Sequence, residues 1–235
     1  MIPHFPMSDR RPKSLGSTLD SISESLFFAE DLSDARRLAG ARSIARRQGL
    51  PGSYAGMFAP TEQDAPGIRL FTGETVRSRV GIANVLGEEA CRVLTVLQVG
   101  DPPVQAALDR AVQGMTTRLE EAERRGYFTG IFCCGRCSAA YWRNLALNLF
   151  PRAEGRLHLG LDGLKQLRRG DGTWRRFPFY YTCLALTEIG PDLARGEMQY
   201  AAAHWQRTLP RLSSKDDAIA CRRATVGRRL LELCG

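Results

Sequence analysis

The chain has 235 residues, enough to bury one sizeable core. Hydrophobic residues make up 43% and charged residues 25%, which is typical of a globular protein, and no run of eighteen apolar residues predicts a transmembrane helix. The net charge is +8, carried mostly by arginine. An arginine excess suits a phosphate or nucleic-acid partner, but the spread of the arginines along the whole chain favours a base composition rich in arginine codons.

The seven cysteines predict free thiols rather than disulfides. Their number is odd and they fall within apolar, helix-like segments, whereas a secreted disulfide framework has paired cysteines. Residues 1–6 also lack the basic and apolar regions of a secretory signal. We therefore expect a cytoplasmic protein.

In chain order, residues 1–17 are rich in proline, serine and basic side chains, and we expect them to be disordered or loosely docked. The rest, 18–235, is predicted to be a single domain. Apolar residues at helical spacing, bounded by glycine and proline, predict helices that begin near 18 and then cover 33–48, 74–99, 104–124, 135–149, 154–168, 178–189, 192–208 and 215–233. Sustained alternation of apolar and polar residues is missing, which indicates an all-α fold.

Three predicted helix ends share a pattern of a glutamine or glutamate, a glycine and an aromatic residue, at 166–174, 48–54 and, more weakly, 123–128. Glycine adopts the left-handed conformation that ends a helix, and a nearby amide or carboxylate can bind the free backbone groups there. The aromatic ring can then pack back across the hairpin. The pattern predicts stacked helix–loop–helix repeats.

The spacing Gln-x5-Gly-x-Trp at Gln166, Gly172 and Trp174 resembles the QW motif of the terpenoid-cyclase and protein-prenyltransferase α/α toroid superfamily. The resemblance covers about residues 45–190. It implies a toroid fold but no activity, because the cyclase Asp-x-Asp-Asp and the prenyltransferase Asp-x-Cys are missing. The chain contains fewer hairpins than a full toroid needs. We therefore expect a partial α/α toroid, or a ring completed by a second copy or a partner chain.

The densest chemical signal is a group of three cysteines, Cys133, Cys134 and Cys137. The Cys-x2-Cys spacing allows two thiolates to bind one zinc or iron ion, or to form a redox pair. No second Cys-x2-Cys or His pair supports a metal site, because His4, His158 and His204 are isolated. The alternative interpretation is a set of small buried side chains in tight helix packing.

The repeat extends this group by one residue. Cys137 and Cys183 each follow a repeat aromatic, Phe128 and Trp174, by nine residues, so they are predicted to occupy equivalent places on neighbouring inner helices. The candidate metal ligands, for zinc or iron, are therefore Cys133, Cys134, Cys137 and Cys183.

A second candidate site combines aromatic and basic residues. The aromatics could line a pocket for an apolar ligand, and the arginines could bind a phosphate-bearing one. Hairpin packing and a solvated loop are the alternatives. The residues are Trp174, Arg175, Arg176, Tyr180 and Tyr181.

Three hypotheses for the function follow. The first is a helical-repeat binding module with a concave face lined by Cys134, Cys137, Tyr180 and Cys183. The second is an enzyme with a thiol or thiolate–metal centre that acts on an isoprenoid-like or other apolar substrate. The third, ranked below these, is a basic nucleic-acid-binding repeat, which the arginine excess alone suggests.

Overall fold

The structure, a computed structural model, describes residues 14–127 and 130–234. These residues are mostly helical, which confirms the predicted all-α class. The helices are α1 (Leu15–Phe27), α2 (Asp34–Ala45), α3 (Arg79–Leu97), α4 (Pro102–Arg124), α5 (Gly135–Ala146), α6 (Ala153–Lys165), α7 (Phe179–Ile189), α8 (Pro191–Ser213) and α9 (Ala218–Cys234). Between α2 and α3 lie a short 3-10 helix (Glu62–Asp64) and two antiparallel strands, β1 (Ile68–Arg69) and β2 (Thr75–Val76), which the sequence did not predict.

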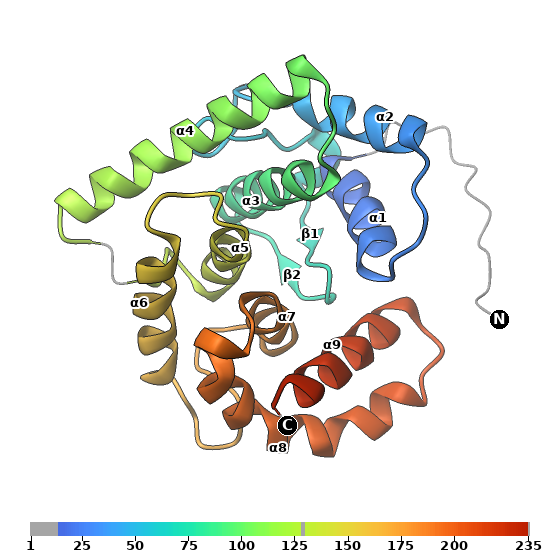
Figure 1. The fold of residues 1–235 in the computed structure, drawn as a ribbon, viewed down its shortest axis with the longest axis vertical. Helices are drawn as coiled ribbons and strands as arrows, with labels where there is room; N and C mark the ends of the chain where they lie inside the picture. The colour runs from blue at the N-terminus through green and yellow to red at the C-terminus, as the bar shows by residue number, and fades with distance from the viewer. Residues whose placement is uncertain (1–13, 128–129, 235) are drawn as a thin grey trace.

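The helices form two curved layers (Figure 1). In the inner layer α1, α3, α5, α7 and α9 each pack against the next, while α2, α4, α6 and α8 lie outside them. Burial follows this division. Outer helix α4 buries one apolar stripe, at spacings of three and four residues, whereas residues 137–145 of inner helix α5 are buried on every side. The alternation of inner and outer helices is that of helix–loop–helix repeats.

The two ends of the inner layer meet within this one chain. Arg222 of α9, which is almost fully buried, forms ion pairs with Asp20 at 2.7 Å and Glu24 at 3.0 Å, both on α1. The same guanidinium donates a hydrogen bond to the carbonyl of Phe71, 3.1 Å away. The two ends of the layer are thus joined through side chains of the same chain.

The first helix begins earlier than the sequence predicted. The Ser14 hydroxyl accepts the N–H of Ser17 at 2.9 Å, and the Asp64 carboxylate accepts the N–H groups of Leu15 and Gly16. These contacts satisfy the free donors at the helix start, so residues 15–17 are helical rather than loosely docked. The remainder of the predicted N-terminal segment, 1–13, lies outside the described residues.

The structure changes the alignment of the repeat turns. After α6, Arg168 forms a β-bridge with Trp174, and after α2, Gln48 forms one with Phe58. Phe58, which is fully buried, is therefore the counterpart of Trp174, and the predicted counterpart Tyr54 is not. The error arose because the loop between the bridged residues is longer in the first copy.

The weak third copy, at 123–128, is described only in part. Tyr127 is 76% exposed, so it does not pack across a hairpin, and Phe128 lies outside the described residues. Glu123 binds Arg152 and Arg156 rather than the end of its own helix. Among the described residues, the turns after α2 and α6 share the bridge, and the third copy stays a prediction.

Trp174 is also held differently from the predicted motif. Its indole N–H donates to the carboxylate of Glu197 on α8 at 2.8 Å, and Arg168 forms an ion pair with that carboxylate at 2.7 Å. Gln166 is exposed and stands apart from this contact. Across 14–127 and 130–234, no helix is both long enough and apolar enough to cross a membrane.

Candidate metal centre at the start of helix α5

The cysteine-containing segment is held in place by the first turns of α5. Ser138 accepts the N–H of Phe132 at 2.9 Å and donates its hydroxyl to the carbonyl of Cys134 at 2.8 Å. One turn further on, the indole N–H of Trp142 donates to the carbonyl of Gly130 at 3.1 Å. These bonds fold the segment back along the helix that follows it and make Cys134 the N-cap of α5.

The three cysteines that the sequence singled out are brought together. The Sγ atoms of Cys133, Cys134 and Cys137 all lie within 4.8 Å of one another. The Sγ atoms of Cys134 and Cys137 are 3.4 Å apart, with Cys137 one turn inside the helix. Cys133 is exposed, Cys134 is half-buried and Cys137 is fully buried, so one edge of the group faces solvent.

The glycine between the cysteines is required by close packing. A Cβ atom added to Gly135 would lie 2.7 Å from the Cα of Phe177 and would overlap the carbonyl of Arg176. The start of α5 thus rests on the segment that leads into α7. Any larger residue at 135 would push the two apart and move the adjacent thiols.

The protonation of the thiols is shared. Hydrogen bonds from the thiols of Cys133 and Cys137 lower the pKa of Cys134 well below its usual range. The hydrogen bond with Cys134 raises the pKa of Cys133, and those with both neighbours raise the pKa of Cys137, since each would become a second negative charge beside the first. A metal ion that bound all three sulfur atoms would displace the protons that remain on them.

Tyr54 lies over this group instead of filling the repeat position predicted for it. Its ring meets the ring of Phe132 edge-on, with centroids 6.0 Å apart. Burial raises the pKa of its hydroxyl, and the nearby guanidinium of Arg118 on α4 opposes that rise. Helix α4 can come this close because Gly114 has no side chain. A Cβ atom at that position would overlap the carbonyl of Ala55.

No protein-family model, curated protein or solved structure matches this chain. Zinc bound to thiolates has Zn–S bonds of about 2.3 Å, which puts tetrahedral sulfur ligands about 3.8 Å apart. The sulfur atoms of the cysteine group are close to that arrangement, so small side-chain rotations would let all three contact one ion.

Cys183 does not join the group, contrary to the sequence prediction. It is fully buried, and its Sγ accepts a hydrogen bond from the indole N–H of Trp205 at 3.3 Å. Burial raises the pKa of this thiol. Cys137 and Cys183 do lie on the neighbouring inner helices α5 and α7, but the Cys183 thiol meets the indole of Trp205 rather than the other cysteines. Cys183 is a packing residue of the inner layer.

The predicted aromatic and basic site is not assembled on one open face. Trp174 and Tyr181 are buried in the core, and each donates a hydrogen bond to a glutamate. Tyr180 is half-buried, with the guanidinium of Arg223 4.1 Å from its ring centroid. Arg175 and Arg176 are exposed, away from the buried rings. Ordinary hairpin packing accounts for the rings, and the concave face expected to carry them is not lined by these side chains.

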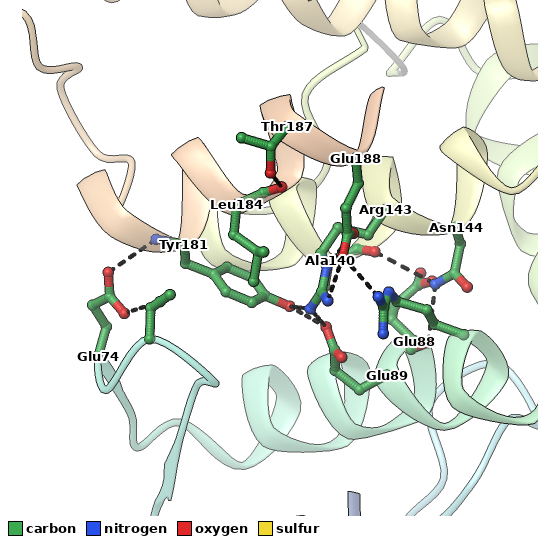
Figure 2. A network of polar contacts seen from close by, with 12 residues as sticks. Glu74, Glu88, Glu89, Ala140, Arg143, Asn144, Tyr181, Leu184, Thr187 and Glu188 are labelled. Atoms are coloured by element: carbon green, nitrogen blue, oxygen red, sulfur yellow. Dashed lines mark hydrogen bonds and ion pairs between the residues drawn. The ribbon is translucent and has the colours of Figure 1, made fainter. Parts of the chain in front are cut away.

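Sequence reasoning missed a buried network of charges between α3, α5 and α7 (Figure 2). Arg143 is 2% exposed and forms ion pairs with Glu89 at 2.5 Å and Glu188 at 2.6 Å. Arg92 binds the same Glu188 at 2.7 Å. A charged residue inside the apolar stretch of α5 was the available signal. Because the two arginines balance the two glutamates, the network connects the inner helices and leaves no charge free.

A second buried carboxylate, Glu88, points away from that network. It is fully buried, and one of its oxygens accepts the Asn144 amide N–H at 2.7 Å. Burial raises the pKa of Glu88 to about 8, opposed by the Asn144 hydrogen bond and assisted by the charge of Glu89. Glu88 is therefore protonated in the folded protein at neutral pH. It is closed off from solvent, whereas the cysteine group is not.

Proposed function

We propose that the protein is a metal-binding helical-repeat protein in which the thiolates of Cys133, Cys134 and Cys137 bind one zinc ion. The observation that carries this proposal is the approach of the three Sγ atoms to within 4.8 Å of one another. Soft thiolate ligands favour zinc or iron–sulfur clusters over magnesium and calcium. Iron–sulfur clusters are usually held by four cysteines, so three favour zinc.

The scaffold of this site is, in the same proposal, an incomplete relative of the α/α toroid. Two observations support it, the alternation of inner and outer helices and the buried Trp174 at a repeat turn. Activity on an isoprenoid-like substrate would need a pocket of exposed aromatic rings. The predicted rings at Trp174 and Tyr181 are buried, so the proposal ends at metal binding.

The metal content of the purified full-length protein tests the proposal. We expect one zinc per chain, measured by elemental analysis, and loss of that zinc in Cys133→Ser and Cys134→Ser. Cys133 is exposed, so its replacement should leave the fold intact, which circular dichroism would check.

Cys221→Ser provides the matched control, because Cys221 is an exposed cysteine on α9 and lies outside the group. It should keep its zinc. A protein that purifies without metal and takes up no zinc on titration would refute the proposal. Stoichiometric iron in place of zinc would refute the choice of ion.

A second candidate function is a dithiol–disulfide pair formed by Cys134 and Cys137. It is favoured by their Sγ separation of 3.4 Å and by the position of half-buried Cys134 at the start of α5. The Cys134 thiolate would attack a low-molecular-weight disulfide and release one thiolate. The Cys137 thiol would then lose its proton and attack Cys134 Sγ, which releases a second thiol and leaves an intramolecular disulfide.

Equilibration with mixtures of reduced and oxidised glutathione would separate the two functions. A redox pair would show one two-electron transition by thiol alkylation, abolished in Cys137→Ser and retained in Cys221→Ser. A dedicated zinc site would bind metal under reducing conditions and resist oxidation while loaded. If the thiols neither bind zinc nor form the disulfide, both functions are refuted, and the cysteines act only as small side chains in tight helix packing.

A further inference from the structure

The cysteine group supplies only three ligands to a zinc ion, which usually takes four. Structural zinc sites are closed by a fourth protein ligand, whereas a site with three leaves one position for water or an added ligand. Among the described residues, no histidine, aspartate, glutamate or further cysteine joins Cys133, Cys134 and Cys137 in a set close enough to share an ion. We infer that the proposed zinc site, on which this inference rests, has an open fourth position that binds a small oxyanion.

The open position lies on the solvent side of the group. Cys137 is fully buried and Cys133 is exposed, so an ion held by both meets solvent beside Cys133. Tyr54 and Arg118 lie at this edge. The Tyr54 ring packs against Phe132, the neighbour of Cys133 in sequence, and the positive charge of Arg118 acts on the Tyr54 hydroxyl. Arg118 itself is exposed on α4.

The charges explain why an oxyanion would be selected. Three thiolates and one Zn²⁺ carry a net charge of −1, which by itself would repel an anion. The guanidinium of Arg118 offsets that charge, and its planar set of N–H donors suits carboxylate or phosphate oxygens. The Tyr54 phenol is a hydrogen-bond donor beside this guanidinium. We expect the metal ion, the guanidinium and the phenol to contact the same ligand.

Cobalt substitution makes the fourth ligand visible. The full-length protein would be loaded with Co²⁺ in place of zinc, and its visible absorption followed during a titration with inorganic phosphate at constant ionic strength. We expect a saturable change in the d–d bands. In Arg118→Ala the phosphate concentration at half-saturation should rise about tenfold, because a charge-assisted contact is lost. Cobalt stoichiometry should be unchanged.

Arg124→Ala is the matched control, since Arg124 is another exposed arginine on α4, and its titration should follow that of the wild type. A cobalt spectrum that does not respond to phosphate would overturn the inference while leaving the metal proposal standing. A spectrum altered by His4→Ala before any phosphate is added would also overturn it, because His4, which precedes the described residues, would then be the fourth ligand. Failure to bind cobalt would instead refute the proposed function.

Discussion

Replacement of Glu88 by glutamine should remove a specific loss of stability at neutral and alkaline pH. Burial keeps Glu88 protonated in the folded protein, with its pKa raised from 4.5 to about 8. Glutamine has the shape of the protonated acid and no charge at any pH. It can still accept the amide N–H of Asn144, which is 2.7 Å from the carboxylate.

The sign follows from proton uptake on folding. Between pH 4.5 and about 8 the carboxyl of Glu88 is ionised in the unfolded chain and protonated in the folded one, so folding binds a proton. The favourable contribution of this proton to the free energy of unfolding is therefore complete below pH 4.5 and is lost as the pH rises to about 8. The full interval corresponds to roughly 5 kcal/mol, of which about 3 kcal/mol is lost by pH 7. Glu88→Gln should escape this loss.

Urea unfolding followed by circular dichroism, from pH 5 to pH 9, measures the effect. The difference in unfolding free energy between Glu88→Gln and the wild type should be small at pH 5 and should grow by about 1.4 kcal/mol per pH unit up to pH 8. Glu120→Gln, which changes an exposed glutamate on α4, should give a curve parallel to that of the wild type. If the Glu88→Gln curve is also parallel, Glu88 is ionised in the folded protein and our reasoning is wrong.

Three further substitutions test the packing that positions the site. Arg143→Met leaves half-buried Glu89 without an ionic partner and leaves Glu188 with Arg92 alone, so it should reduce the unfolding free energy by roughly 3–5 kcal/mol. Arg125→Met breaks only an exposed pair and should cost less than about 1 kcal/mol. Equal losses would contradict the network. Trp174→Phe removes the hydrogen-bond donor to buried Glu197 and should reduce the unfolding free energy by about 1–3 kcal/mol. The zinc content should not change. A loss of zinc would show that the Trp174 turn and the cysteine group are coupled. Gly135→Ala should weaken zinc binding, because the added Cβ atom forces the start of α5 to move. Competition with a chelator measures the zinc affinity. An unchanged affinity would show that the cysteine group tolerates the shift.

The sequence was sufficient for the helices because their signals are local. Ser33 caps α2 and Asp101 caps α4, each through a side-chain oxygen that accepts a backbone N–H three residues ahead. The helix that follows Pro178 was placed within one residue of its observed start. Apolar spacing, caps and glycine ends act over one or two turns, which is the distance over which a sequence pattern can be read directly.

Part of the cysteine group could also be predicted, because the signal for it is local. Cys134 and Cys137 are three residues apart at a helix start, so local geometry alone brings their Sγ atoms to 3.4 Å. The predicted fourth member, Cys183, depended on how two repeats align in space. The two thiols lie on neighbouring inner helices, but the Cys183 thiol accepts the indole N–H of Trp205 instead of joining the group.

What the sequence determined by itself was the number and approximate bounds of the helices and the Cys134–Cys137 pair. Tertiary structure alone decided the partners across helices: Phe58 as the counterpart of Trp174, and Arg143 between its glutamates. It also placed Tyr54 and Arg118 beside the cysteine group. The reason is physical, since helical periodicity specifies which face of a helix is buried but not which side chain it meets there.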